Sequence, residues 1–300
     1  MGHRSAARGR PARPPGERDP RRGRLPRLTR FVPRPENGRS AGGGHRRLAA
    51  AGSDSGRDAV DGTEISQHAG NIVDRLGSTQ LPPPVWVVVM TGVVALALVG
   101  YTPVWRVARN VVTIAHEGGH AVVALLTGRQ LAGIRLHSDT SGVTVSRGKP
   151  RGLGMILTTL AGYPAPPLLG LGGAALLGMD RITVALWAAI GLCAALLIAI
   201  RNLYGALSVI GTGGLMFAVS WFGTDAQQAA LAYLAVWFLL LAGLRPVLEL
   251  QRTRRRQPGS DADQLGHLTH VPGVVWVLVF GVISAASLVL GASLLTAPLR

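Results

Sequence analysis

A series of long apolar segments follows residue 84, and this series constrains the fold more than any other feature of the 300-residue chain. Each segment supplies roughly 20 residues free of charged side chains, about the length that a helix needs to cross a bilayer. The segments are Val85 to Tyr101, Leu153 to Leu177, Ile182 to Ile200, Leu203 to Phe222, Ala226 to Leu244 and Val274 to Leu295. A further apolar helix, around His116, brings the expected number to about seven crossings.

We therefore predict an all-α polytopic membrane protein with a membrane-embedded domain over residues 84–298. The preceding residues 1–83 are rich in Arg, Pro and Gly and have no apolar periodicity, so we expect a disordered basic tail. The tail also lacks the apolar core of a secretory signal peptide, so we do not expect its removal.

The formal net charge of +16 raises the question of a nucleic-acid partner. Much of this charge lies in the tail, where a solvated extension is the simpler interpretation, and no nucleic acid is expected. The single cysteine, Cys193, lies in an apolar segment, which excludes a disulfide framework and a thiolate metal site. The use of Arg over Lys, with abundant Ala and Gly, is typical of a GC-rich bacterial genome.

Basic residues also suggest an orientation, because loops on the cytoplasmic side carry an excess of Lys and Arg. With seven crossings and a cytoplasmic N-terminus, two basic loops share the cytoplasmic side and the C-terminus lies outside. The basic residues of these loops are Arg129, Arg135, Arg147, Lys149 and Arg151, and then Arg245, Arg252, Arg254, Arg255 and Arg256. We thus expect a multi-pass protein of a bacterial plasma membrane, surrounded by the lipid bilayer.

The segment TIAHEGGHAVVALLTG, residues 113–128, places three ionisable side chains within an apolar helix. HEGGH fits the H-E-x-x-H pattern, in which His116 and His120, four residues apart, share one helix face and can bind one Zn²⁺. Glu117 is offset around the helix and can accept a proton from a zinc-activated water and pass it to the leaving amine. A pair of packing histidines beside an accidental Glu is the alternative, but unpaired polar groups in hydrocarbon are costly.

Together with LAGYPAPPLLG at residues 160–170 and the later SDADQL, residues 260–265, this helix resembles the site-2 protease family of intramembrane zinc metalloproteases, in its bacterial site-2-protease-like branch. The resemblance covers about residues 84–298. It implies that His116 and His120 are zinc ligands, that Glu117 is the catalytic base and that an Asp from a later segment completes the site. It also implies that the substrates are other membrane proteins, cut within or near the bilayer.

The third ligand is absent from its usual place in that family, because the segment that begins Asn202-Leu203-Tyr204-Gly205 carries no carboxylate. The SDA element favours Asp261, with Asp263 in reserve. Ser260 to Asp263 also form a good helix N-cap sequence, so these acids could be metal ligands or could cap a helix. One of the two acids could also bind the metal while the other caps the helix. His267 and His270 are more typical of polar residues at a membrane interface.

The residues between the His helix and the next apolar segment, IRLHSDTSGVTVSRG, alternate in polarity around a Thr-Ser-Gly turn and predict a small β-hairpin that contains Asp139. Such a hairpin could receive an unwound substrate strand by edge pairing. An intramembrane zinc endopeptidase is therefore the first hypothesis. A catalytically silent membrane binding protein of the same family is the second, and a metal transporter is disfavoured because the segments 182–200 and 226–244 offer almost no polar partners. The sequence names no particular substrate and no oligomeric state.

Overall fold

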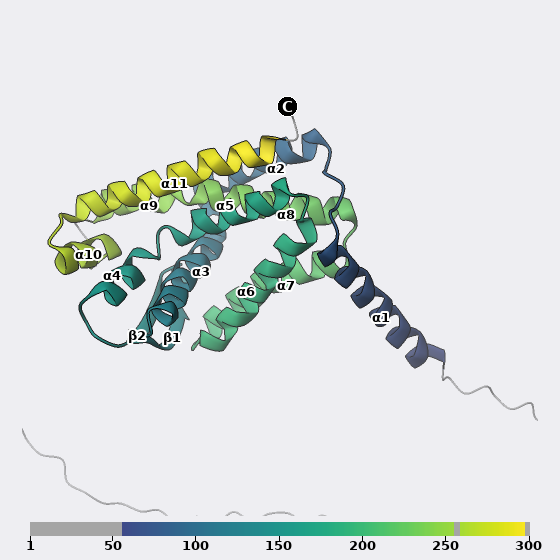
Figure 1. The fold of residues 1–300 in the computed structure, drawn as a ribbon, viewed down its shortest axis with the longest axis horizontal. Helices are drawn as coiled ribbons and strands as arrows, with labels where there is room; N and C mark the ends of the chain where they lie inside the picture. Colours follow the sequence, from purple (N-terminus) through teal and green to yellow (C-terminus); the bar gives the residue numbers. More distant parts are fainter. Residues whose placement is uncertain (1–55, 255–258, 298–300) are drawn as a thin grey trace, which may run out of the picture. The chain divides into compact units, whose positions relative to one another are not determined.

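A computed structural model describes residues 56–254 and 259–297, which belong to one unit of the chain, Asp54–Arg300 (Figure 1). The described residues form helices and one small sheet. The elements are α1 (Gly56–Gly77), α2 (Val85–Gly100), α3 (Thr102–Leu126), β1 (Gln130–Leu136), β2 (Gly142–Arg147), α4 (Leu153–Leu160), α5 (Ala165–Gly178), α6 (Ile182–Ala199), α7 (Leu203–Phe222), α8 (Asp225–Ala242), α9 (Leu244–Thr253), α10 (Asp261–Thr269) and α11 (Gly273–Thr296).

The number of membrane-crossing helices differs from the seven expected. Within the described residues, four helical stretches are long and apolar enough to cross a bilayer: α6, α7, α8 together with α9, and α11. The number rises to six if each of two bent pairs, α2 with α3 and α4 with α5, counts as one span. The seven expected crossings include α2 and α3 as two separate spans, but these helices meet at an angle of 103° rather than running antiparallel. Seven spans are therefore not confirmed.

Both bends coincide with proline. Helix α3 begins with Thr102 and Pro103, and its N-cap Tyr101 is extended at φ −81° and ψ 106°. Pro164 lies between α4 and α5, which meet at 70°. Proline cannot donate a hydrogen bond to the preceding turn, and it disfavours helical geometry at the residue before it. Continuous apolar sequence is thus divided into short helices of different direction.

Helix α1 lies within residues 1–83, where a disordered tail is expected from the sequence. Gly56–Gly77 is helical, so the expectation of a structureless segment does not hold there, whereas residues 1–55 lie outside the described residues. Near its end, Arg75 forms an ion pair with Asp225, the first residue of α8, at 2.5 Å. The chain that follows also joins the bundle, because the backbone N–H of Gln80 donates to the carbonyl of Asp180.

The main apolar core is formed by residues of α2, α5, α6, α8 and α11. Its buried members include Val88, Ala174, Leu177, Leu186, Ala232, Tyr233, Leu240 and Leu295. A second core joins α9, α10 and α11, with Leu250, Leu265 and Phe280 at its centre. Burial of apolar side chains between these last three helices fixes α10 against the bundle, although α10 itself is short and polar.

The two strands form an antiparallel sheet whose two edges have different environments. Arg201 donates its backbone N–H to the carbonyl of Ile134 at 2.9 Å, along the outer edge of β1. The side chain of Asn202 continues this edge: its amide donates to the carbonyl of Leu136 at 2.6 Å, and its oxygen accepts from the N–H of Leu136 at 3.1 Å. The outer edge of β1 is therefore occupied, and β2 lies beside the polar cavity described below.

Candidate metal and catalytic site

Helix α3 carries both histidines of the HEGGH motif on the face that looks toward α4 and α10. Because one helical turn separates them, their Nε2 atoms lie 3.1 Å apart. The Nδ1 atom of His120 lies 2.7 Å from the carbonyl oxygen of Thr158 on α4. A carbonyl can only accept, so His120 carries its proton on Nδ1 and keeps the Nε2 lone pair for another partner. This is the arrangement by which a metal-binding imidazole is usually oriented.

Asp261, the first residue of α10, is the third member of the cluster formed with His116 and His120. Its Oδ2 atom lies 3.2 Å from Nε2 of His116 and 3.3 Å from Nε2 of His120. The three side chains offer ligand atoms that all lie within 4.8 Å of one another. Asp261 thus lies beside His116 and His120, although 145 and 141 positions of the sequence separate it from them.

The residues present fit a divalent metal ion. Two imidazole nitrogens and one carboxylate oxygen form a donor set typical of catalytic zinc, which keeps a further position open. The Oδ2 atom of Asp261 is buried and has no hydrogen-bond partner of proper geometry among the described residues. Burial opposes the charge of this carboxyl, and the pKa of Asp261 lies well below its usual range only where the imidazoles that face it carry protons. A buried carboxylate aimed at two imidazole lone pairs calls for a cation between them.

Glu117 lies beside this group and is held by the hairpin. It is only 5% exposed, and the hydroxyl of Thr144 on β2 donates to its Oε2 at 2.6 Å. The same hydroxyl lies 3.1 Å from the backbone carbonyl of Glu117. With Oε2 so engaged, Oε1 is the oxygen that remains available to exchange a proton.

Two glycines leave the space that these side chains occupy. A Cβ on Gly142 would lie 2.6 Å from Cγ of Glu117 and 2.7 Å from its Oε1. A Cβ on Gly162 would overlap Nε2 of His120 and lie 2.6 Å from Cε1 of His116. Real side chains do not approach so closely, so any larger residue at Gly142 would displace Glu117, and any larger residue at Gly162 would displace the candidate ligands.

The two acids of the SDA element have separate contacts. Asp263 exchanges hydrogen bonds with Ser260, the N-cap of α10: its Oδ2 accepts from the hydroxyl at 2.8 Å, and its N–H donates to Oγ at 3.3 Å. Its Oδ1 atom also lies 3.3 Å from a guanidinium nitrogen of Arg254. Asp263 therefore stabilises the start of α10, while Asp261 lies next to it and points toward the histidines.

A polar cavity of about 340 Å³ opens at these groups. Besides the motif residues it is lined by the β2 residues Gly142, Val143, Thr144 and Ser146 and by residues of α4 and α10. Tyr163, in the break between α4 and α5, forms one wall: its ring meets the ring of His116 edge-on at 4.9 Å and stacks on Phe280 at 4.9 Å. The wall is thus fixed by packing against α11.

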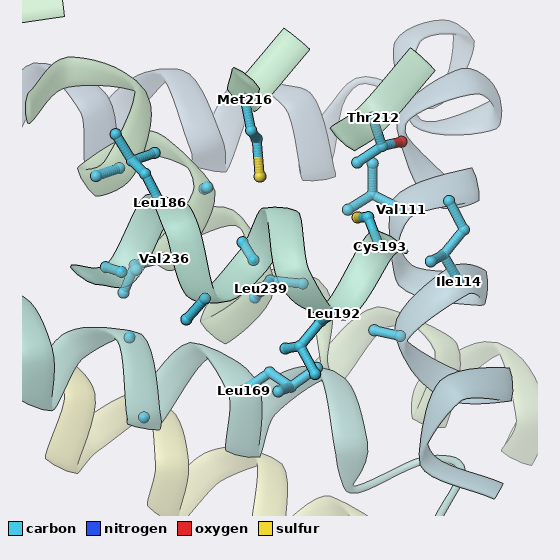
Figure 2. Close-up of a pocket in the computed structure, with 18 of the residues that line it drawn as sticks. Val111, Ile114, Leu169, Leu186, Leu192, Cys193, Thr212, Met216, Val236 and Leu239 are labelled. Carbon is cyan, nitrogen blue, oxygen red and sulfur yellow. The ribbon is translucent and has the colours of Figure 1, made fainter. Parts of the chain in front are cut away.

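Another cavity, of about 350 Å³, is lined by residues of α3, α5, α6, α7 and α8 (Figure 2). Val111 and Ile114 face it from α3, and Leu192, Cys193 and Met216 face it from α6 and α7. Among the described residues, its lining is almost entirely apolar and contains no acid, base or metal-binding pair, so the candidate metal and catalytic groups lie at the polar cavity.

Comparison with known families agrees with this geometry. The Peptidase M50B-like family matches residues 79–291. The chain belongs to this family. The predicted resemblance to the site-2 protease family of membrane metalloproteases is thereby confirmed. No curated protein and no solved structure matches the chain.

For this M50B-like peptidase, sequence reasoning missed several residues around the motif. Thr144 and Gly142 were not predicted as site residues, because only tertiary folding brings the hairpin to α3. A signal existed in the alternation of β2, where the small or polar residues Gly142, Thr144 and Ser146 line the polar cavity and alternate with two valines that are about half exposed, of which Val143 also lines the cavity. Asn202, which we had compared with a family motif, instead holds the edge of β1.

Proposed function

We propose that this M50B-like chain is an intramembrane zinc endopeptidase that hydrolyses peptide bonds of other membrane proteins. The observation that carries the proposal is the convergence of His116, His120 and Asp261 within 4.8 Å, with Glu117 beside them. The apolar helices that carry the site agree with a multi-pass membrane protein. The composition agrees with the plasma membrane of a bacterium.

In this proposal His116, His120 and Asp261 hold the zinc ion. A bound Zn²⁺ supplies Lewis acidity at this position, which makes water a competent nucleophile near neutral pH. Glu117 takes the proton of the attacking water on Oε1 and delivers it to the leaving amine. Thr144 keeps the carboxylate oriented by its bond to Oε2. Thr158 fixes the tautomer of His120, so that Nε2 faces the site throughout.

The substrate would bind as an extended strand along β2. The outer edge of β1 is covered by Arg201 and Asn202, whereas residues of β2 line the polar cavity. Adding a strand at such an edge satisfies the main-chain hydrogen bonds of an unwound substrate. A helix must unwind before cleavage because its carbonyls are engaged within the helix, and edge pairing would offset part of that cost.

The proposal is tested with protein purified in detergent. We expect about one zinc per chain by elemental analysis in the wild type and in the E117Q variant, and cleavage of a peptide library by the wild type alone. The H116A variant should lose both zinc and cleavage. Metal-free wild-type protein that retains its fold, or an E117Q variant that cuts at the parental rate, would contradict the proposal.

A further inference from the structure

A smaller cavity of about 150 Å³ adjoins the polar cavity and shares several of its walls. His116, Glu117, Gly142 and Tyr163 line both. The two cavities therefore extend in different directions from the same catalytic groups, as the two sides of a cleaved bond would require. The smaller one lies toward the start of α3, at the hairpin turn.

The two cavities differ in charge. Arg109 lines the smaller cavity, and no Lys or Arg is among the described residues that line the larger one. The side chain of Arg109 is 40% exposed, so its guanidinium remains accessible from this cavity. A peptide that passes from one cavity to the other would meet a fixed cation on one side only.

The positive charge of Arg109 is only partly neutralised. Its nearest acid, Glu249, lies 3.5 Å away and has two other partners: Arg245 and the indole N–H of Trp105 each donate to its Oε1 at 3.1 Å. Two guanidinium groups thus share one carboxylate, which leaves an excess positive charge. Within the part of the chain that the structure describes, the guanidinium of Arg109 has the ion pair with Glu249 but donates no hydrogen bond, whereas that of Arg245 donates several.

The spacing along α3 sets the distance between this charge and the cleavage point. Arg109 precedes His116 by seven residues, two helical turns, so the two lie on one face about 10 Å apart at 1.5 Å rise per residue. An extended peptide advances about 3.3 Å per residue. A substrate carboxylate bound by Arg109 would therefore lie about three residues from the scissile bond.

We propose that Arg109 is a specificity-determining residue that binds a peptide carboxylate about three positions from the scissile bond. The carboxylate belongs either to an Asp or Glu side chain or to the C-terminus of the peptide. Guanidinium binds carboxylates through paired, charge-assisted hydrogen bonds, and the free donors of Arg109 suit this role. The inference rests on the proposed peptidase function and names a class of substrate for it.

The test compares cleavage patterns in a mixed peptide library, with products sequenced by mass spectrometry. For the wild type we expect about tenfold enrichment of Asp and Glu near the third position on one side of the cut, or release of about three C-terminal residues. C-terminal amidation of the library separates the two sources, because it abolishes only the second pattern. In the R109Q variant the enrichment should vanish while cleavage of neutral peptides persists.

The matched control is R106Q, since Arg106 lies on the same helix, is exposed and lines neither cavity. This variant should keep the wild-type pattern. An independent readout uses the E117Q protein, which should bind a Glu-containing peptide about tenfold more tightly than its Gln counterpart, a difference that R109Q removes. Cleavage without any preference for carboxylates would overturn the role of Arg109 and leave the peptidase function intact. Absence of cleavage and of zinc would overturn the function itself.

Discussion

The hydroxyl of Thr144 on β2 donates to Oε2 of Glu117 on α3 at 2.6 Å, and this bond ties the hairpin to the candidate catalytic base. Helix α3 alone does not fix Glu117, because the side chain has several rotamers and the hydrogen bond to its carboxylate comes from β2, outside this helix. The hairpin thus has two tasks in the proposed mechanism. Thr144 fixes the base, and the strand that carries it lines the cavity where the substrate would bind.

Replacing Thr144 by Val should therefore reduce turnover while zinc remains bound. A hydrogen bond to a charged group contributes about 1.5–3 kcal/mol, so we expect kcat to fall tenfold or more, with little change in KM. Serine at this position keeps the hydroxyl, so T144S should retain most of the activity. Steady-state kinetics with zinc analysis of each variant measures both effects, and equal losses in T144V and T144S would show that the hydroxyl is not the cause.

The two acids at the start of α10 should respond differently to substitution. D261A removes a candidate ligand, and we expect zinc affinity to fall at least a hundredfold, as read by competition with a chelating dye. D263A removes the bonds to Ser260 and Arg254, which should cost about 1 kcal/mol of stability as the loss of a helix cap does. Zinc should remain bound in D263A. The opposite ranking of the two variants would identify Asp263 as the ligand.

Space around the histidines gives a steric prediction. In G162A the new methyl group would overlap His120 and crowd His116, so zinc binding should be lost although no ligand is removed. The control is G211A: nothing lies within 4 Å of a Cβ at this position of α7, and Ala is the better helix former by about 1 kcal/mol. Elemental analysis and thermal unfolding of both variants separate a blocked site from a general loss of folding. Full zinc occupancy in G162A would contradict the geometry.

Much of the site could be read from sequence because its main elements are local. The spacing of His116 and His120 places both on one face of any helix, and their apolar setting makes them candidate ligands. The place of Asp261 could not be predicted from local spacing, because only the packing of α10 between α9, α11 and α4 brings this residue to α3. Its choice over Asp263 depended on the family resemblance, and the N-cap alternative stayed open. Thr144 is marked only by the alternation of β2, and the space that Gly162 leaves for the histidines is evident only once the chain is folded.

The fold was predicted in kind but not in detail. Apolar length identifies membrane helices well, because every backbone group in hydrocarbon must be bonded within its helix. Length does not reveal direction, and the angle of 103° between α2 and α3 arises at Tyr101 and the proline that follows Thr102. The predicted number of seven spans takes the bend between α2 and α3 as a loop between two crossings. Two helices that cross a bilayer in succession run roughly antiparallel, whereas α2 and α3 are nearly perpendicular.

The bend between α2 and α3 leads to a prediction about membrane topology. If each bent pair forms one span, the six spans place the N-terminus and the C-terminus on the same side of the membrane, whereas seven would place them on opposite sides. Alkaline phosphatase and fluorescent protein fusions at residues 79 and 298 should therefore report the same side. A fusion in the turn at Gly223, between α7 and α8, should agree with both. With six spans the basic loops after α3 and α9 face away from the N-terminus, so a cytoplasmic N-terminus no longer follows from their charge. Fusions that place the two termini on opposite sides would restore α2 and α3 as separate crossings.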